Sequence, residues 1–278
     1  MILEHTDIQT GYVTTEGDAI YYEVRGHGPP LVMIPAASGD AGLYSFVADI
    51  LCDEYKVITY DRRGFARSTR HEPQNFEVSQ QSRDAVAVLQ AVGERAAFVF
   101  GSSSGAIFAL DLAKTQPNVV KAVVAHEPPV ARVLPDSQRW LRFFAGLYWM
   151  ALRLSVNLAM LRFALRIGIP VVLAMRKAPR DVASRSDKVA DFFVRHELLP
   201  VTNYQPDVAL IRQNGVRVIM AAGQWSLDKH KFYARTVPIL AERLGCEMVT
   251  FPGHHSSYVD RPKEWAAALR STLHKARA

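Results

Sequence analysis

The sequence predicts an α/β protein built on a mostly parallel sheet with helices on both faces. Apolar runs of strand length alternate with helix-length amphipathic segments along the chain, which is the pattern of such a sheet. The run ending at Phe100 stops abruptly at the small-residue stretch Gly-Ser-Ser-Ser-Gly, residues 101–105. About ninety residues separate two of the later runs, far more than one crossover helix needs. We therefore expect a segment inserted into the sheet protein.

The strands can be assigned in chain order. Residues 11–15 and 19–24 predict two antiparallel strands, and the Gly26-His27-Gly28-Pro29-Pro30 cluster after them predicts a turn. The later apolar runs are almost continuous, which is typical of strands covered on both faces. They lie at 31–35, 57–60, 97–100, 119–125, 216–222 and 248–251. Helical patterns lie between them at 41–51, 79–92, 106–115, 229–244 and 262–274.

The inserted segment is expected to be helical. Residues 136–175 are rich in leucine, phenylalanine, tryptophan and alanine, with arginines at roughly helical intervals, and predict two or three amphipathic helices. Pro170 and Pro179 should break them. We therefore divide the chain into a core of residues 1–130 and 205–278 and a helical cap of residues 131–204.

Composition excludes several classes of protein. A chain of 278 residues with 49% hydrophobic residues can bury a large core. Cys52 and Cys246 lie far apart and match neither a disulfide framework nor metal-ligand spacing, so no metal is expected. The N-terminus lacks the features of a signal peptide, and no apolar window is long enough to span a bilayer. A cytoplasmic protein without stable membrane insertion is the expectation.

The positive charge belongs to one segment. The formal net charge is +6, but residues 131–200 hold 12 lysines and arginines against 5 acidic residues, a net charge of +7. The rest of the chain is therefore close to neutral. No nucleic-acid motif accompanies this charge, so no nucleic-acid partner is expected.

The pattern Gly101-x-Ser103-x-Gly105 indicates a nucleophile elbow. In such an elbow a sharp strand-to-helix turn holds the central serine in a strained conformation and exposes its hydroxyl. The small flanking residues let the strand and the helix approach closely. A plain glycine-serine turn is the alternative, so the neighbouring strand ends must decide.

Reactive side chains follow several other predicted strands. Because the carboxyl ends of parallel strands share one edge of a sheet, the loops after them should meet there. These loops are Pro-Ala-Ala-Ser-Gly at 35–39, Tyr-Asp-Arg-Arg-Gly at 60–64, His-Glu-Pro-Pro at 126–129 and Pro-Gly-His-His at 252–255.

Together these motifs resemble the α/β-hydrolase superfamily over essentially the whole chain. The likeness rests on the elbow, the Asp61-Arg62-Arg63-Gly64-x-x-x-Ser68 loop, the insert after the sixth strand, and a late Pro-Gly-x-His with a proline seven residues after the histidine. The resemblance implies an eight-stranded sheet with a helical cap. It also implies a nucleophile, an acid and a histidine brought together in space.

The resemblance assigns the nucleophile and the base. Ser103 takes the first role, and a serine rather than an aspartate there argues against haloalkane dehalogenase and epoxide hydrolase chemistry. A serine hydroxyl needs a histidine to take its proton and a carboxylate to orient that histidine. The Pro-Gly-x-His spacing and the interval to Pro262 select His255 over His254.

The acid has two candidates. Many relatives carry an aspartate three residues after the glycine that ends the seventh strand, where this chain has Ser226, and the nearest carboxylate is Asp228. Glu127 directly follows the sixth strand, where other members of the superfamily carry their acid. We favour Glu127, with Asp228 as the alternative.

The oxyanion hole should use two backbone N–H groups. In this fold they come from the residue after the nucleophile, Ser104, and from the loop after the third strand, where Ala37 is expected and Ser38 is the alternative donor. Relatives usually have His-Gly in that loop, where this chain has Pro35-Ala36.

A narrower resemblance concerns the site motifs. The Ser-Ser-Gly elbow, His-Glu-x-Pro and Pro-Gly-x-His-x-x-Tyr resemble the fungal zearalenone lactonases, which use a Ser-Glu-His triad, and the likeness fades in the cap. The triad is carried over and the substrate is not. Pocket candidates from the site loops and the aromatic cap are Ser38, Trp140, Phe144 and Tyr258.

The resulting hypothesis is a cofactor-independent serine hydrolase of the carboxylesterase or lactonase type, acting on a hydrophobic small molecule. A carbon–carbon bond hydrolase or a thioesterase would use the same groups, and a receptor that retains its triad is the alternative outside enzymes. The apolar cap helices also offer a surface for a homodimer.

Overall fold

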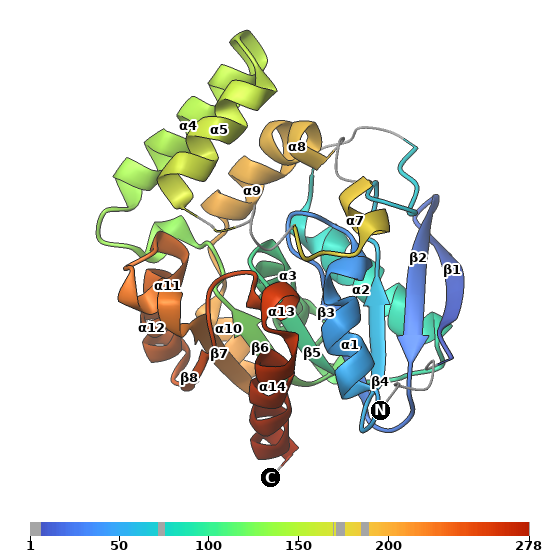
Figure 1. Cartoon of the computed structure of the whole chain (residues 1–278). Helices are drawn as coiled ribbons and strands as arrows, with labels where there is room; N and C mark the ends of the chain where they lie inside the picture. The colour runs from blue at the N-terminus through green and yellow to red at the C-terminus, as the bar shows by residue number, and fades with distance from the viewer. Residues whose placement is uncertain (1–6, 72–75, 169, 171–175, 185–188, 278) are drawn as a thin grey trace.

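Eight strands form one sheet in the order β1-β2-β4-β3-β5-β6-β7-β8 in the computed structural model (Figure 1). The structure describes residues 7–71, 76–168, 170, 176–184 and 189–277. The β1–β2 and β2–β4 pairs are antiparallel, and all later pairs are parallel. The α/β class and the mostly parallel eight-stranded sheet are therefore confirmed.

The strand bounds lie within two residues of the predicted ones. The strands are β1 (Gln9–Thr15), β2 (Asp18–Arg25), β3 (Pro30–Ile34), β4 (Lys56–Tyr60), β5 (Ala97–Ser102), β6 (Val120–His126), β7 (Val218–Gly223) and β8 (Glu247–Phe251). The helices of the sheet layers are η1 (Ala41–Tyr44), α1 (Ser45–Leu51), α2 (Val78–Ala91), α3 (Ser104–Thr115), η2 (Pro117–Val119), α10 (Val208–Gln213), α11 (Gln224–Asp228), α12 (Phe232–Leu244), α13 (Ser257–Asp260) and α14 (Pro262–Arg277).

Two predicted helices differ from the helices of the structure. The first divides into η1 and α1, and η1 begins where the side chain of Asp40 accepts a hydrogen bond from the N–H of Gly42. The helix predicted over 229–244 starts only at Phe232, after a separate α11. Between them His230 has a φ of 47° and Lys231 is extended, so the chain leaves helical geometry there.

Two helical layers cover the sheet. Figure 1 shows α1 and α14 on one face of the sheet and α2 and α3 on the other. Alternate residues of each strand point to opposite faces, so Leu31 and Met33 of β3 pack with α1 and α14, whereas Val32 and Ile34 pack with α2, α3 and α12. Trp265 of α14 is fully buried in the first of these layers. Because both faces are apolar, the strands read as nearly continuous hydrophobic runs.

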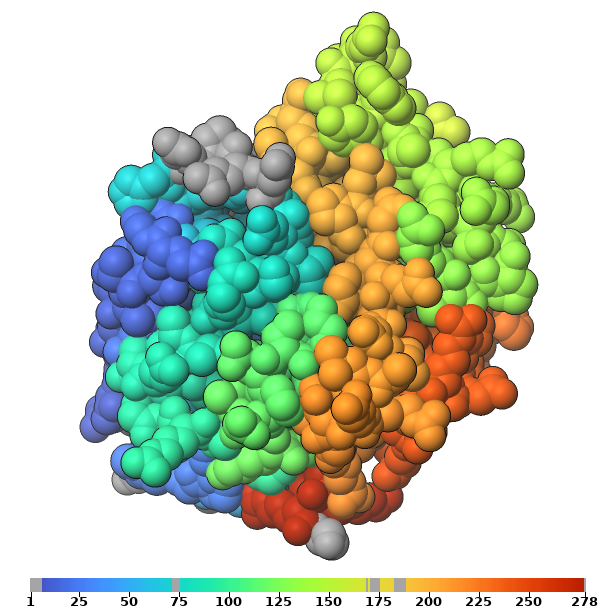
Figure 2. Space-filling model, turned by 180° about the vertical axis from the view of Figure 1, so that it is seen from behind, coloured from blue at the N-terminus to red at the C-terminus, as the bar shows by residue number. Residues whose placement is uncertain are grey.

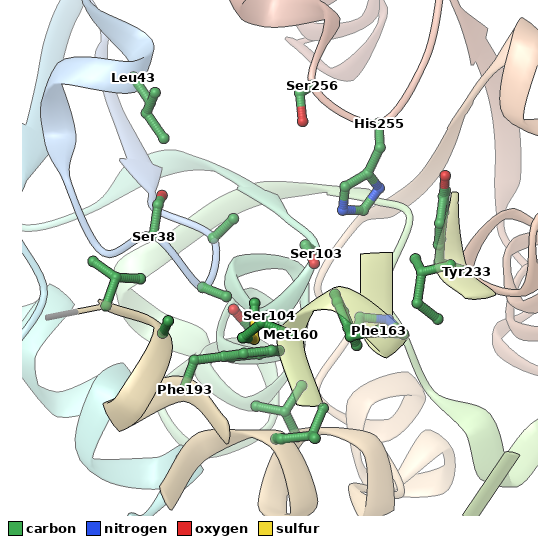
Figure 3. A pocket seen from close by; sticks show the side chains of 18 of the residues that line it. Ser38, Leu43, Ser103, Ser104, Met160, Phe163, Phe193, Tyr233, His255 and Ser256 are labelled. Atoms are coloured by element: carbon green, nitrogen blue, oxygen red, sulfur yellow. The ribbon is translucent and has the colours of Figure 1, made fainter. Parts of the chain in front are cut away.

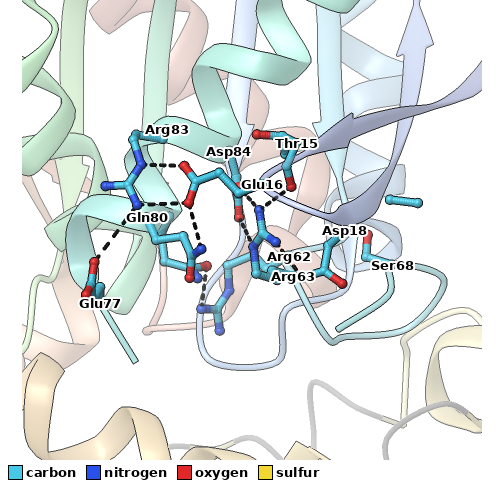
Figure 4. Close-up of polar contacts among 12 residues, drawn as sticks. Thr15, Glu16, Asp18, Arg62, Arg63, Ser68, Glu77, Gln80, Arg83 and Asp84 are labelled. Carbon is cyan, nitrogen blue, oxygen red and sulfur yellow. Dashed lines mark hydrogen bonds and ion pairs between the residues drawn. The ribbon is translucent and has the colours of Figure 1, made fainter. Parts of the chain in front are cut away.

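Buried charge joins the first hairpin to the helix layer (Figure 4). The guanidinium of Arg63 donates to both oxygens of Asp84 in α2, to Asp18 of β2 and to the carbonyl of Thr15. A buried cation is tolerated when its donors are satisfied in this way. This network fixes the loop that follows β4.

Helices α4 to α9 lie between β6 and β7, and we call them the cap. Their bounds are α4 (Ser137–Arg153), α5 (Val156–Ile167), α7 (Arg180–Ser184), α8 (Val189–Phe192), a π-helical turn (Phe193–Glu197) and α9 (Leu198–Asn203), preceded by η3 (Ala131–Val133). The last three follow one another without a break. Of the helices predicted over 136–175, the structure describes α4 and α5, and residues 171–175 lie outside the described residues.

The two prolines expected to break cap helices lie outside the described helices. Gly168, in the left-handed conformation with a φ of 60°, ends α5 two residues before Pro170. Pro179 directly precedes α7. In the described part of the chain no helix is both long and apolar enough to cross a bilayer.

Candidate active site

The turn between β5 and α3 has the geometry of a nucleophile elbow. Ser103, between the two elements, has φ 57° and ψ −124°, a conformation that L-residues rarely adopt. A Cβ at Gly101 would lie 2.1 Å from the carbonyl oxygen of Gly105, and one at Gly105 would lie 2.3 Å from that of Ile34. Glycine is therefore required at both positions, which explains the Gly-x-Ser-x-Gly pattern.

Ser103 and His255 line the same cavity, which has a volume of about 390 Å³. Figure 3 shows Ser103 and the His255 ring at neighbouring positions on its wall. His255 lies in the loop between β8 and α13, and its side chain is largely buried. We call this space the active-site cavity.

Glu127 contacts His255 at the ring nitrogen Nδ1. Its Oε2 lies 2.5 Å from Nδ1 of His255, and its Oε1 accepts a hydrogen bond of 2.9 Å from the N–H of Gly223. The carboxylate is fully buried, and Glu127 has a φ of 49° at the end of β6. Since Glu127 accepts at Nδ1, the nitrogen of His255 left to act toward the cavity is Nε2.

The surroundings of Glu127 favour its ionised form. Burial acts to raise the pKa of this carboxyl, but the neighbouring His126 and the hydrogen bonds from His255 and Gly223 outweigh it and lower the pKa below its usual range. An ionised carboxylate is therefore available to stabilise a protonated His255.

The two competing side chains lie elsewhere. Asp228 is exposed at the end of α11, and its carboxylate accepts a hydrogen bond from Nε2 of Gln224 at 2.8 Å. His254 turns to Asp260, with 3.1 Å between Nε2 and the carboxylate. The structure thus brings Ser103, Glu127 and His255 together, and Asp228 and His254 do not join them.

The loop after β3 borders the cavity on the side of Ser104. Ala37, Ser38 and Ser104 all line the cavity. The carbonyl of Ala36 accepts hydrogen bonds from the N–H of Gly39 and from Nε of Arg62, at 2.9 and 3.1 Å. In a trans peptide the next N–H points the opposite way, so these bonds fix the orientation of the Ala37 N–H.

Arg62 is a site residue that the sequence motif contained but for which no role was predicted. Its fully buried guanidinium donates to Glu197 of the cap at 2.8 Å and to Gln81 of α2 at 3.2 Å. The rings of Phe65 and Phe108 pack against it at 4.6 and 5.1 Å. One side chain therefore connects the loop after β3, the core and the π-helical turn of the cap.

The cavity wall is largely apolar. Three predicted pocket residues, Ser38, Phe144 and Tyr258, line it. Trp140 does not: it stacks behind Phe144 and Phe232, with ring centroids 6.0 and 4.6 Å away, and its Nε1 donates to Asp136. A helix that must bury an apolar stripe uses this tryptophan for packing.

Tyr233 was not predicted as a site residue. It lines the cavity from α12, and its ring centroid lies 4.3 Å from that of His255 (Figure 3). No local motif surrounds it, because α12 reaches the site only through the fold. Its packing restricts the orientation of the histidine ring.

His126 lies beneath the site without lining the cavity. It is fully buried, and its Nδ1 lies 2.9 Å from Oγ of Ser102. Burial lowers the pKa of His126 to about 4, so the ring is neutral at neutral pH.

Neither cysteine is in a disulfide, and the described residues hold no group of three or more histidine, cysteine or acidic side chains that could bind a metal ion.

Comparisons with known proteins agree with this fold. Residues 29–158 match a family model described as the alpha/beta hydrolase fold. An uncharacterized hydrolase of Bacillus subtilis, YraK, is 30% identical over 274 residues, which cover 96% of this chain and 97% of that protein. A zearalenone hydrolase of Cladophialophora bantiana is 32% identical over 128 residues, 45% of this chain and 48% of its own. Among solved structures, a thermophilic esterase from Thermogutta terrifontis has a TM-score of 0.76 at 17% identity, covering 97% of this chain and all of its own, which supports the fold.

Proposed function

The chain belongs to the α/β-hydrolase family, and on that premise we propose that it is a serine hydrolase that cleaves a carboxylic ester or lactone of a hydrophobic small molecule. The observation that carries the proposal is the buried Glu127–His255 pair, whose histidine lines the same cavity as a serine on a strained elbow. This arrangement supplies a nucleophile, a base and an orienting carboxylate.

In the proposed reaction Ser103 Oγ attacks the substrate carbonyl carbon while Nε2 of His255 takes the hydroxyl proton. Glu127 stabilises the resulting imidazolium, and the N–H groups of Ser104 and Ala37 stabilise the oxyanion. Collapse of the tetrahedral intermediate breaks the ester bond, and His255 gives its proton to the leaving oxygen. Water then attacks the acyl-enzyme with His255 as base, which releases the acid and restores Ser103.

The cavity favours an uncharged, apolar substrate. Its volume of about 390 Å³ lies in the usual range for small-molecule sites. Among the described residues that line it there is no lysine or arginine, and the one carboxylate is that of Asp40. A carboxylate on the substrate would be left unpaired there, at a substantial desolvation cost. We propose that residues 131–204 act as the cap that selects the substrate.

The names of two similar proteins support the proposed bond type. One is named a zearalenone hydrolase and a structural neighbour is titled an esterase. Both names describe those proteins, and together with the apolar cavity they support ester or lactone cleavage here.

A fluorophosphonate probe tests the proposal. We expect the purified protein to be labelled at Ser103, with labelling abolished by Ser103→Ala and retained by the matched control Ser102→Ala. A panel of neutral esters and lactones of graded size should then be hydrolysed. Absence of labelling at Ser103 in folded protein would contradict the enzyme proposal and favour a small-molecule receptor.

A further inference from the structure

Helices α4 and α5 form a hairpin that projects beyond the rest of the molecule. Figure 1 shows the pair extending away from the sheet, and Figure 2 shows the same projection from behind. The two helices pack on each other, and the inner part of the hairpin contacts the rest of the cap. Its outer surface is therefore open over most of its length.

That outer surface is unusually apolar. On α5, Leu158, Leu161 and Leu165 are 46, 57 and 77% exposed, and their spacing of three and four residues puts them on one face. Trp149 and Leu154, near the turn between the helices, are 54 and 72% exposed. Leucines in such a row are rare on a surface that faces water alone.

The opposite face of α5 is also apolar. Met160, Phe163 and Ile167 point inward and line the active-site cavity. The helix is therefore apolar on two opposite sides, and the core explains one of them. A helix of this kind needs a second apolar environment on its outer side.

The positive charge of the hairpin indicates which apolar environment its outer side contacts. Ser137–Gly168 contains five arginines and no acidic residue, and all five arginines are exposed. Within the described part of the chain none of them is ion-paired to a carboxylate. Arg162 and Arg166 each directly follow a leucine of the exposed row, so they flank it on one side.

A second copy of the chain fits this surface poorly. A two-fold contact places the same patch on both partners, so arginines would face arginines with no carboxylate on either hairpin. An anionic lipid surface offers both an apolar environment and negative charge. Its acyl chains can surround the leucines, and its phosphates can pair with arginines that extend to the headgroups. Charge complementarity therefore favours the bilayer.

We propose that the α4–α5 hairpin docks the protein peripherally on an anionic bilayer, with the leucine row of α5 in the interface. Since the inner side of α5 lines the active-site cavity, docking would bring the cavity close to molecules dissolved in lipid. That last consequence rests on the proposed function, whereas the docking itself does not.

Vesicle flotation tests the docking. The protein of residues 1–278 is mixed with phosphatidylcholine vesicles, with or without phosphatidylglycerol, at low and high salt. We expect binding to the anionic vesicles that weakens as salt screens the arginines. Leu161→Ser with Leu165→Ser should lower the partition coefficient about tenfold or more, and Arg162→Gln with Arg166→Gln should lower it about tenfold or more on anionic vesicles.

Matched controls lie outside the hairpin. Leu210→Ser on α10, 37% exposed, and Arg243→Gln on α12 should bind vesicles like the wild type. Light scattering reports the oligomeric state of each variant, and circular dichroism its fold. Hydrolysis of a water-dissolved ester should be unchanged in the hairpin variants, which separates failure of docking from failure of the proposed function.

Three results would overturn the proposal. The first is no vesicle binding by the wild type. The second is equal loss in the hairpin and control variants. The third is a wild-type dimer that Leu161→Ser converts to a monomer without any vesicle binding, which would make a second copy the occupant of this surface.

Discussion

The core and the cap line one cavity with side chains of different kinds. The core contributes Ser103, His255 and the loop at Ala37, each held by hydrogen bonds or by backbone geometry that tolerates little change. The cap contributes almost solely apolar side chains, among them Phe144, Met160, Phe163, Ile167, Phe193, Leu198 and Val201. In the proposed function the core therefore carries out the chemistry and the cap selects the substrate, and we expect that each can be altered alone.

The largest expected effect is on the core side, where the acid is replaced. Glu127→Gln keeps the shape of the side chain but favours the wrong tautomer of His255, so kcat should fall by about 10⁴-fold. Asp228→Asn should change kcat less than about twofold, because Asp228 is exposed and hydrogen-bonded to Gln224. Steady-state kinetics on an ester substrate measures both. If Asp228→Asn is the inactive variant, the triad drawn from the geometry is wrong.

The core could be predicted well because its constraints are local. The glycines at 101 and 105 are imposed by carbonyl oxygens about 2 Å from any added Cβ, and such a constraint leaves a fixed pattern in the sequence. Glu127 follows β6 directly, so its position relies on the sheet alone. Residues of this type can be located once the strands are assigned.

The cap was harder to predict because its contacts are not local. The helical spacing of apolar residues and arginines predicted α4 and α5. It could not show that Trp140 packs behind Phe144. Nor could it show that Met160 and Phe163 face the cavity. Both faces of α5 are apolar, so hydrophobicity does not distinguish the inner from the outer side. Tyr233 illustrates the same limit, since it reaches His255 from a helix far along the chain.

The next largest effect concerns the connection between the two regions, the buried pair Arg62–Glu197. Glu197→Leu leaves the Arg62 cation buried without its partner, which should lower the free energy of unfolding by about 3 to 5 kcal/mol. Combining it with Arg62→Met should recover part of this loss, because no unpaired charge remains. Urea unfolding of the single and double variants completes the cycle.

A matched control for that cycle lies two residues from Glu197, in the same π-helical turn. Arg195 pairs with Asp191 at 2.7 Å in an exposed position, so Arg195→Met should cost less than about 1 kcal/mol. If both arginine variants destabilise the protein equally, burial is not what makes the Arg62 pair important.

A smaller effect is a pH dependence of stability that comes from a buried histidine of the core, His126, and that the apolar cap wall should not show. The pKa of His126 is lowered to about 4, so between about pH 6.5 and 4 the unfolded chain binds a proton that the folded protein does not. The free energy of unfolding should therefore decrease as the pH is lowered through this window. This residue should contribute about 3 kcal/mol to the decrease in total. His126→Asn, which can still bond Ser102, should remove this share of the slope. Unfolding curves between neutral pH and pH 5 check it, and an unchanged slope would contradict the assignment.

The smallest effect is expected from the cap wall, and it should alter specificity without altering chemistry. Met160→Ala enlarges the cavity beside the substrate, so the ratio of kcat/KM for long-chain to short-chain esters should change about tenfold. Labelling by a small fluorophosphonate should stay within about twofold of wild type, because the triad is untouched. Met150→Ala on α4, which does not line the cavity, is the matched control and should leave the ratio unchanged. A cap variant that slows labelling as strongly as it shifts specificity would show that the cap also positions the catalytic groups, and the division between core chemistry and cap selection would then fail.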